Sequence, residues 1–423
     1  MIVGASVAGT HVAEQLRAHG YRPPITLIDA ETRPPYDRPP LSKGILLGKA
    51  SHDSIRLQAD GAAAALDLEL HQGARAVGLR GRTVLCADGR AFTGRHVVLA
   101  TGLSPRRLPG QPSGAASVRT LRTLDDALAL RERLLASTSL AIVGAGLIGC
   151  EVASAARDLG LDVTVIETLP APMTAALGDQ AGQFFAALLR DHGVTLLTSA
   201  AVSAIDADDA SATLTLADGP KITADTVLIA IGSVPNTAWL GSTAATDTTA
   251  ATDTTAATDT TAATDTTAAT DTTAATDTAA ATDTAAATDT AAATDTGLTC
   301  DATGQVRGHD DGVFAVGDIA AWPDPATGRH RRQEHWMSAR AQAAAVAATI
   351  CGQPPAPAKP DYAWTDQFGL LIQILGRPDR AERTVQLEEK VLGYYARDQL
   401  VGALILGAPR RKAHYNRLIS ATA

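Results

Sequence analysis

Short apolar runs alternate with helical segments along most of the chain, and the pattern is clearest between Ala141 and Glu167. An apolar run at 141–143 leads into a glycine-rich turn, which is followed by a helical pattern that ends at Gly160. A second apolar run then covers 162–166. Strand, turn, helix and strand in this order are typical of a βαβ unit. The pattern therefore predicts an α/β protein with a parallel sheet.

The turn of this unit has the spacing G-x-G-x-x-G, with Gly144, Gly146 and Gly149 at the three glycine positions. The first glycine makes the turn, the second lets backbone N–H groups approach a pyrophosphate, and the third lets helix and strand pack closely. Glu167 follows Gly149 by 18 residues, where an acid can bind the ribose hydroxyls of an adenine nucleotide. We therefore expect dinucleotide binding; a turn that serves packing alone is the alternative.

A second motif of this kind opens the chain. Gly4, Ser6 and Gly9 occupy the three positions, and a strand at 25–28 ends on Asp29, 20 residues after Gly9. Serine is small enough to let a backbone approach phosphate, so we expect a second dinucleotide site here. The strand before this turn is short, which leaves two interpretations open: the start lies upstream, or the strand itself is shortened.

An apolar run at 97–101 followed by Gly102 closes the first βαβ unit, and a matching run at 227–231 followed by Gly232 closes the second. This order predicts two nested Rossmann-like domains followed by a C-terminal α+β domain. The expected bounds are 1–110 with 297–328, then 111–242, then 329–423. After the hexads the chain comes back to the first unit. There an apolar strand ends at a glycine turn that carries Asp318, and we expect a helix to begin after this turn.

Residues 243–296 form nine hexads, six TAATDT and three AAATDT. A period of six matches neither a helix nor a strand, and the segment has no aromatic or branched aliphatic side chain. It cannot bury enough apolar surface to offset the entropy of ordering, so we predict disorder. An adhesive or metal-binding array of Asp residues is the alternative.

The composition argues against a nucleic-acid partner, a membrane-spanning segment and a metal site. The net charge of −9 comes from the hexads, because outside them the 45 acids fall to 36 and equal the 36 bases. Nothing therefore suggests a nucleic-acid partner, and no apolar run reaches membrane-spanning length. Cys86, Cys150, Cys300 and Cys351 are far apart and lack metal-site spacing, so we expect a reduced, cytoplasmic protein without a bound metal.

Four further segments carry a family resemblance: 35–43 (PYDRPPLSK), 121–126 (LRTLDD), 314–318 (FAVGD) and 364–367 (WTDQ). With the two glycine motifs, they make the chain resemble the ferredoxin reductases of the two-dinucleotide-fold flavoprotein class, of the putidaredoxin-reductase and rubredoxin-reductase type. The resemblance covers residues 1 to about 420 apart from the hexads. It implies FAD on the first unit, NADH on the second and a C-terminal domain that covers the flavin.

The resemblance also assigns site residues. It places these residues around FAD: Gly4, Ser6, Gly9, Asp29, Arg38, Lys43, Arg122, Asp318 and Trp336. It places these around NADH: Gly144, Gly146, Ile148, Gly149, Glu167 and Gly232. Lys43, Glu151 and Trp364 would serve catalysis, with Glu151 facing Lys43 near the nicotinamide and Trp364 at the electron exit. The alternative for each charged or aromatic residue is a surface ion pair or a core aromatic.

The implied activity is transfer of electrons from NADH through FAD to a [2Fe–2S] ferredoxin that feeds a bacterial oxygenase. Two alternatives stay open: another acceptor (rubredoxin, a nitrite reductase partner or oxygen), and a decayed, non-catalytic nucleotide-binding protein. Glu167 is followed by no nearby base, which favours NADH over NADPH. A dock for an acidic ferredoxin would use Arg329, Arg331, Arg332, Arg410, Arg411 and Lys412, unless these are simply a solvated face. The sequence leaves the oligomeric state open.

Overall fold

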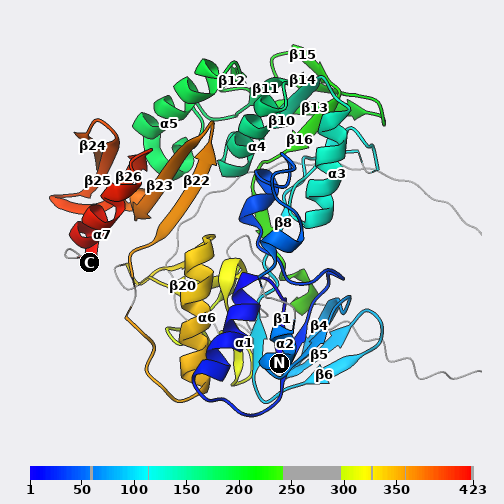
Figure 1. Ribbon diagram of the computed structural model, residues 1–423, viewed down its shortest axis with the longest axis vertical. Coiled ribbons are helices and arrows are strands. Elements are labelled where there is room, and N and C mark those ends of the chain that lie inside the picture. The colour runs from blue at the N-terminus through cyan, green and yellow to red at the C-terminus, as the bar shows by residue number, and fades with distance from the viewer. Residues whose placement is uncertain (58–60, 113, 242–296, 325–326, 358, 421–423) are drawn as a thin grey trace, which may run out of the picture.

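The computed structural model describes residues 1–57, 61–112, 114–241, 297–324, 327–357 and 359–420 (Figure 1). The disorder expected for 243–296 lies outside these residues. Within them the molecule has two α/β units, one above the other in Figure 1, and a C-terminal sheet beside the upper unit. In the described part of the chain, no helix is long and apolar enough to cross a bilayer.

The first unit is built on a five-stranded sheet of order β19-β7-β1-β2-β3. All its neighbouring strands are parallel. The strands are β1 (Ile2–Val3), β2 (Ile25–Ile28), β3 (Leu68–His71), β7 (Val97–Leu99) and β19 (Val313–Ala315). The central strand β1 is only two residues long, yet it pairs on both sides and is buried. The chain therefore enters the first glycine motif from the middle of the sheet.

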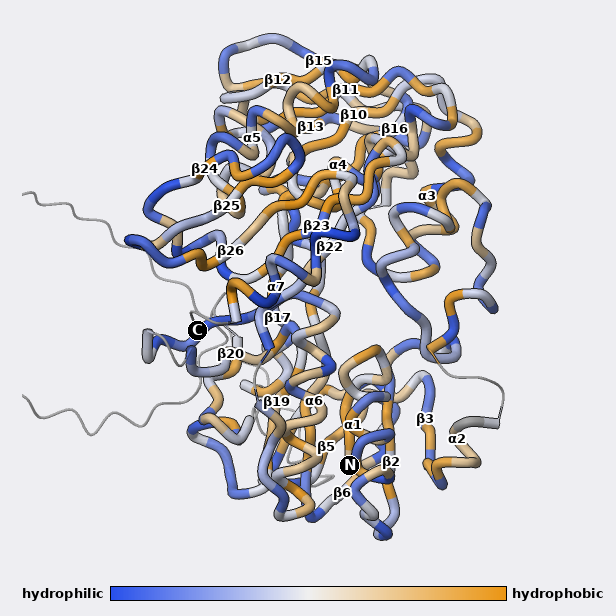
Figure 2. The backbone as a smooth tube through the Cα atoms, turned by 60° about the vertical axis from the view of Figure 1, so that its left-hand side comes forward, coloured by the Kyte–Doolittle hydropathy of each residue, from blue (hydrophilic) through white to orange (hydrophobic). Residues whose placement is uncertain are grey.

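The second unit repeats this topology with the order β12-β11-β10-β16-β9, again all parallel. Its strands are β9 (Val118–Arg119), β10 (Ser139–Val143), β11 (Asp162–Ile166), β12 (Thr195–Leu197) and β16 (Thr226–Ile229). The central strands are continuous hydrophobic stretches in Figure 2, because both faces of the sheet are covered, one by helices and the other by a small antiparallel sheet. The predicted nesting of two dinucleotide folds is confirmed.

Each unit also carries a three-stranded antiparallel meander. In the first unit it comprises β4 (Ala76–Arg80), β5 (Thr83–Cys86) and β6 (Ala91–Thr93). In the second it comprises β13 (Val202–Ala207), β14 (Ala212–Leu216) and β15 (Lys221–Ala224). The two crossings between the units, β8 (Leu103–Pro105) and β17 (Ser233–Pro235), pair with each other as an antiparallel ribbon.

The helices begin where the glycine motifs and capping residues place them. Helix α1 (Val7–Ala18) follows the first motif and α4 (Leu147–Asp158) the second. Helix α3 (Leu124–Leu135) starts at a capping box, in which Thr123 Oγ1 accepts from Asp126 N over 3.1 Å. The Asp126 carboxylate in turn accepts from Thr123 N over 2.8 Å. The helix start expected at 121–126 is therefore confirmed.

The C-terminal domain is an antiparallel sheet of order β22-β23-β26-β25-β24. Its strands are β22 (Tyr362–Gln367), β23 (Leu370–Gly376), β24 (Arg383–Glu388), β25 (Val391–Ala396) and β26 (Gln399–Leu406), followed by α7 (Lys412–Ser420). It packs its apolar face on α5 (Thr174–Asp191) of the second unit. Buried Tyr394 fixes this contact by donating its hydroxyl to the carbonyl oxygen of Leu177 over 2.9 Å.

Two expectations from the sequence differ from the structure. Asp318 does not open a helix: one 3₁₀ turn (Gly317–Ile319) leads directly into β20 (Ala320–Pro323), which pairs with two neighbouring strands. Helix α6 (Trp336–Ile350) falls within the range expected for the C-terminal domain, but it packs against α1 and joins the core of the first unit (Figure 1). Its small alanine side chains allow this close helix contact.

Candidate functional site

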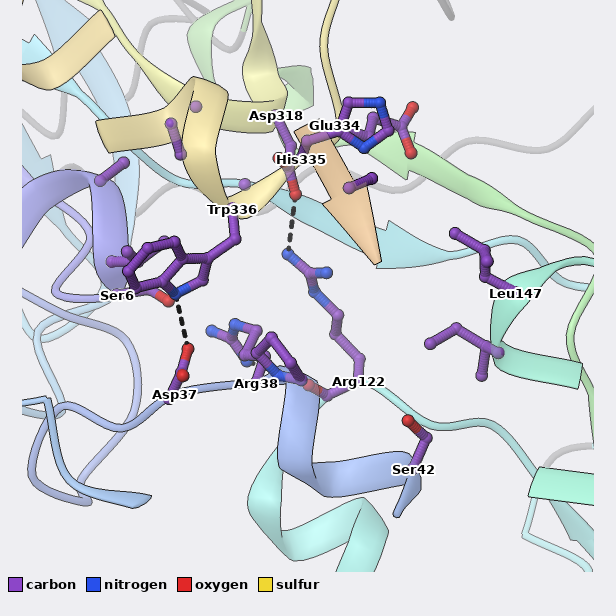
Figure 3. A pocket seen from close by; sticks show the side chains of 18 of the residues that line it. Ser6, Asp37, Arg38, Ser42, Arg122, Leu147, Asp318, Glu334, His335 and Trp336 are labelled. Atoms are coloured by element: carbon purple, nitrogen blue, oxygen red, sulfur yellow. Dashed lines mark hydrogen bonds and ion pairs between the residues drawn. The ribbon is translucent and has the colours of Figure 1, made fainter. Parts of the chain in front are cut away.

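A cavity of about 250 Å³ lies where the two units and the C-terminal sheet meet. Its walls are the N-terminal end of α1, the 37–43 segment, the Gly317–Ile319 turn, the start of α6, the start of α4 and the strand β22. Figure 3 shows side chains from these separate segments converging on one space. Such a junction between domains is where small-molecule sites are usually found.

The two glycine motifs have the same backbone geometry. Gly4 and Gly144 have φ values of +106° and +102°, and a β-carbon on them would lie 2.3 and 2.4 Å from the carbonyl oxygens of Ala100 and Ala230, which directly follow the adjacent strands β7 and β16. On Gly9 and Gly149 a β-carbon would lie 1.9 and 2.1 Å from the carbonyl oxygen of the first glycine. No side chain fits at either pair of positions. The turn and packing roles expected for these glycines are therefore confirmed.

The middle positions differ from the other two, because they face open space. Ser6 and Gly146 are the N-caps of α1 and α4, and neither helix has a side-chain cap. Ser6 lines the cavity, and no heavy atom lies within 4 Å of a β-carbon built on Gly146. First-turn N–H groups without a capping side chain can bind an anion, which the helix dipole also favours. Both helix starts therefore suit a phosphate group.

The acids that end the second strands occupy matching places. Glu167 accepts a hydrogen bond from Ala145 N over 2.7 Å, and Asp29 accepts one from the backbone of Ala5. Burial, with a smaller repulsion from Glu31, raises the pKa of Asp29 to about 6. Each carboxylate therefore lies beside its own glycine turn, which is the arrangement that a ribose-binding acid requires.

Two arginines face the cavity. Arg38 pairs with Glu31 over 2.9 Å and donates to the carbonyl oxygen of Arg122 over 3.0 Å. Arg122 pairs with Asp318 over 3.6 Å, the contact drawn in Figure 3. Burial and the neighbouring charge of Arg38 lower the pKa of Arg122. Two guanidinium groups next to a helix N-terminus are the donor set that an anionic cofactor needs.

Aromatic rings line the side of the cavity toward the C-terminal sheet. Trp336 donates from Nε1 to Asp37 over 2.8 Å, the hydrogen bond drawn in Figure 3. The Trp336 ring meets the Trp364 ring edge to face, with their centroids 6.3 Å apart. Tyr362 stacks on Trp364 at 5.6 Å, and Lys412 Nζ lies 3.5 Å above the Tyr362 ring. The rings form a continuous series from the cavity toward the basic C-terminal segment.

Lys43 and Glu151 form an ion pair at the cavity wall. Lys43 Nζ lies 3.0 Å from Glu151 Oε1 and 3.8 Å from Asp366 Oδ2. Glu151 is 5% exposed and also accepts hydrogen bonds from the hydroxyls of Ser42 and Thr365. The expected approach of Glu151 to Lys43 is confirmed, and the residues come from different units.

The cavity gathers most of the side chains expected from the sequence: Ser6, Arg38, Lys43, Arg122, Ile148, Glu151, Asp318, Trp336 and Trp364. Outside its lining lie Gly4, Gly9, Asp29, Gly144, Gly146, Gly149, Glu167 and Gly232. All but Gly232 belong to the glycine turns or their acids; Gly232 follows β16 with φ +92°. The catalytic and cofactor roles of all these residues stay predictions.

Four polar side chains that line the cavity escaped the sequence analysis: Asp37, Ser42, Glu334 and His335. Asp37 and Ser42 lie within the segment 35–43, so their neighbours Arg38 and Lys43 were the available signal. No local pattern pointed to Glu334 or His335, because the start of α6 reaches the cavity through its packing on α1.

The expected basic dock is largely engaged within the molecule. Arg331 pairs with Asp361, and Arg332 pairs with Glu334 over 2.8 Å. Further along the chain, Arg411 pairs with Glu388 over 2.7 Å. Lys412, as described above, lies over an aromatic ring. These contacts fix the side chains and reduce the net positive charge that a partner would meet.

Among the residues that the structure describes, no group of three or more His, Cys, Asp or Glu side chains could hold a metal ion. The four cysteines are free thiols, and burial raises the pKa of each. Neither observation adds a further reactive centre to the cavity.

Comparison with known proteins agrees with this geometry. The family model described as pyridine nucleotide-disulphide oxidoreductase matches residues 1–268, and a reductase C-terminal model matches 362–423. The chain is 32% identical to the ferredoxin reductase component of chlorobenzene dioxygenase from Cupriavidus sp. (strain PS12), over 100% of this chain and 92% of the relative. It is 30% identical to a rubredoxin-NAD(+) reductase from Pseudomonas putida, over 97% and 96%.

The fold is also similar to that of a solved structure. The covalent complex of putidaredoxin reductase with putidaredoxin matches with a TM-score of 0.82 and 27% identity. The match covers 100% of this chain and 92% of the other. The similarity therefore includes both dinucleotide units and the C-terminal sheet.

Proposed function

This chain belongs to the pyridine nucleotide-disulphide oxidoreductase family, and from that premise we propose that it passes electrons from NADH through FAD to a [2Fe–2S] ferredoxin serving an oxygenase. The observation that carries the proposal is the single cavity that joins a helix N-terminus, two arginines and the Lys43–Glu151 pair. This acceptor is supported by two relatives that are named as the ferredoxin reductase component of chlorobenzene dioxygenase and the ferredoxin--NAD(+) reductase component of a p-cumate 2,3-dioxygenase system.

The first unit fits FAD. The N-terminus of α1, with Ser6 as its cap, would bind the pyrophosphate, and Asp29 would accept from the ribose hydroxyls. Arg38 and Arg122 would hold the anionic part against the 37–43 segment. Held by these residues, FAD would supply the chemistry that converts a two-electron hydride donor into a source of single electrons.

The second unit fits NADH. The uncapped start of α4 would bind its pyrophosphate, and Gly146 leaves room for the approach. Glu167 would accept from the ribose 2′-hydroxyl and would repel a 2′-phosphate, so NADH is favoured over NADPH. Ile148, which is 43% exposed and lines the cavity, would contact the nicotinamide end.

The charged pair and the aromatic rings would act at the meeting point of the two sites. Lys43 would stabilise negative charge that develops in the cavity, through direct electrostatics in a partly buried setting. Glu151 would fix its position. Trp364 would mark the side on which electrons leave, because its ring and that of Tyr362 lead from the cavity toward the outside of the C-terminal domain.

Rubredoxin is the second candidate acceptor, since a relative of nearly equal identity carries that activity in its name. The cytoplasmic location inferred from the cysteine spacing stays a prediction.

An anaerobic visible spectrum of the purified protein, before and after NADH, tests the proposal. A flavin band that NADH bleaches and a [2Fe–2S] ferredoxin restores is the expected result. Recovery with rubredoxin or oxygen, but not with ferredoxin, would assign another acceptor. A protein that stays colourless after incubation with FAD would be a non-catalytic nucleotide-binding protein and would end the proposal.

A further inference from the structure

A buried hydrogen-bonded cluster joins all three parts of the molecule at the carboxylate of Glu151. Ser42 of the first unit donates to Glu151 Oε2, and Thr365 of β22 donates to Oε1 over 2.6 Å. Ser42, Glu151 and Thr365 are 2%, 5% and 0% exposed. The Glu151 carboxylate, which belongs to α4, is therefore held at both oxygens. One oxygen accepts from a hydroxyl of the first unit, and the other accepts from a hydroxyl of the C-terminal sheet.

A further buried side chain sets the direction of the Thr365 hydrogen bond. Gln367, which is fully buried, donates from Nε2 to Thr365 Oγ1 over 3.1 Å. A hydroxyl has one proton, so an oxygen that accepts from Gln367 keeps its proton for Glu151. Thr365 therefore serves the carboxylate as a donor, and the carboxylate is restrained from both sides.

Lys43 has two carboxylates within reach, and they lie in different surroundings. Glu151 is 3.0 Å from Nζ and its side chain is 6% exposed, whereas Asp366 is 3.8 Å away and 50% exposed. An ion pair is stronger in a buried setting than at a solvated rim, provided that its geometry is kept. The orientation of Glu151 therefore decides whether Lys43 stays at the cavity wall or turns toward Asp366.

We propose that Thr365 and Ser42 are positioning residues, which hold Lys43 at the cavity wall by fixing the carboxylate of Glu151. The C-terminal domain thereby completes the reductase site as well as covering it. This inference rests on the proposed function, because its consequence is the rate at which NADH reduces the bound flavin.

Thr365→Val is the main variant, because it removes the hydroxyl and keeps the shape. Thr365→Ser restores the donor. The matched control is Ser154→Ala: Ser154 lies on α4, one turn beyond Glu151, and accepts from Phe368 N of the C-terminal domain over 2.7 Å. Ser154→Ala removes a buried hydroxyl from the same junction but leaves the hydrogen bonds to Glu151 in place.

We expect Thr365→Val to lower the limiting rate of anaerobic flavin reduction by about fivefold, with the apparent Kd for NADH unchanged. Thr365→Ser should stay within about twofold of the wild type, and Ser154→Ala should reduce at the wild-type rate. The midpoint potential of the flavin, titrated with a reference dye, should fall in Thr365→Val because Lys43 leaves the cavity wall. Combining Thr365→Val with Lys43→Ala should add no loss to that of Lys43→Ala alone.

Two results would show that Thr365 is only a contact between domains and would overturn the inference. One is an equal loss of the flavin reduction rate in Thr365→Val and Ser154→Ala. The other is a double variant, Thr365→Val with Lys43→Ala, in which the two losses add. An unchanged midpoint potential would do the same. If Thr365→Val fails to fold, Ser42→Ala takes its place, with the same expected rate and potential. Failure of the proposed function is a separate result: the wild-type flavin itself would then not be bleached by NADH.

Discussion

Substitutions at the second and third glycines of the motif in the second unit should separate ligand binding from folding. A β-carbon on Gly146 meets no heavy atom within 4 Å, and its φ of −77° suits any residue. We therefore expect Gly146→Val to cost about 1 kcal/mol of stability, the usual size of a changed N-cap. On Gly149 a β-carbon would lie 2.1 Å from a backbone oxygen. Gly149→Ala must displace the turn, at a cost of about 3 kcal/mol or more.

Gly146→Val, which should cost little stability, should nevertheless weaken the binding of the dinucleotide. A valine at position 146 would occupy the approach to the start of α4 and block a backbone N–H bond to the pyrophosphate. Losing one such charge-assisted bond costs about 1.5–3 kcal/mol, which corresponds to a fall in affinity of roughly ten- to a hundredfold. Gly146→Ser should keep most of the affinity, since Ser6 stands at the matching position of the first unit.

Calorimetric titration with NAD(+), alongside thermal unfolding, measures both quantities on each variant. Gly146→Val should unfold near the wild-type temperature and bind weakly. If Gly146→Val binds NAD(+) with wild-type affinity, the pyrophosphate does not approach the start of α4, and the motif would then serve packing alone.

Three further outcomes follow from the site. Lys43→Ala should slow flavin reduction by NADH at least about tenfold in single-turnover kinetics, whereas Lys49→Ala, an exposed neighbour, should not; equal rates would remove Lys43 from catalysis. The Asp29 pKa of about 6 exceeds the ordinary 3.8, so the cofactor-free protein should lose stability as pH rises from about 4 to about 6. Asp29→Asn should flatten this dependence in urea titrations, and an unchanged slope would contradict the assignment. Turnover with an acidic ferredoxin should fall as salt rises, because salt screens the attraction between the ferredoxin and the basic residues; turnover that stays constant would count against the basic dock.

Local signals explain why so much of the fold could be predicted. The strands β10 and β11 and the helix between them follow from hydrophobic periodicity and from glycines whose positions are sterically required. The partner of α6 could not be predicted, because an alanine-rich helix carries little polarity to show which surface it covers. The approach of Glu151 to Lys43 was expected, but the two hydroxyls that hold the Glu151 carboxylate were missed. Ser42 and Thr365 are 323 positions apart in the sequence, and only the packing of three domains brings their hydroxyls together.

One topology used twice has produced two different sites, and the difference lies in what covers each turn. Ser6 opens onto a cavity that is enclosed by the 37–43 segment, by α6 and by β22, and the guanidinium of Arg122 is buried there deeply enough to lower its pKa. Gly146 faces open space, and the neighbouring Ile148 is 43% exposed. An enclosed site favours a cofactor that stays bound, and an open one favours a substrate that must enter and leave in each turnover. The later segments of the chain, rather than the shared motif, therefore distinguish the proposed FAD site from the proposed NADH site.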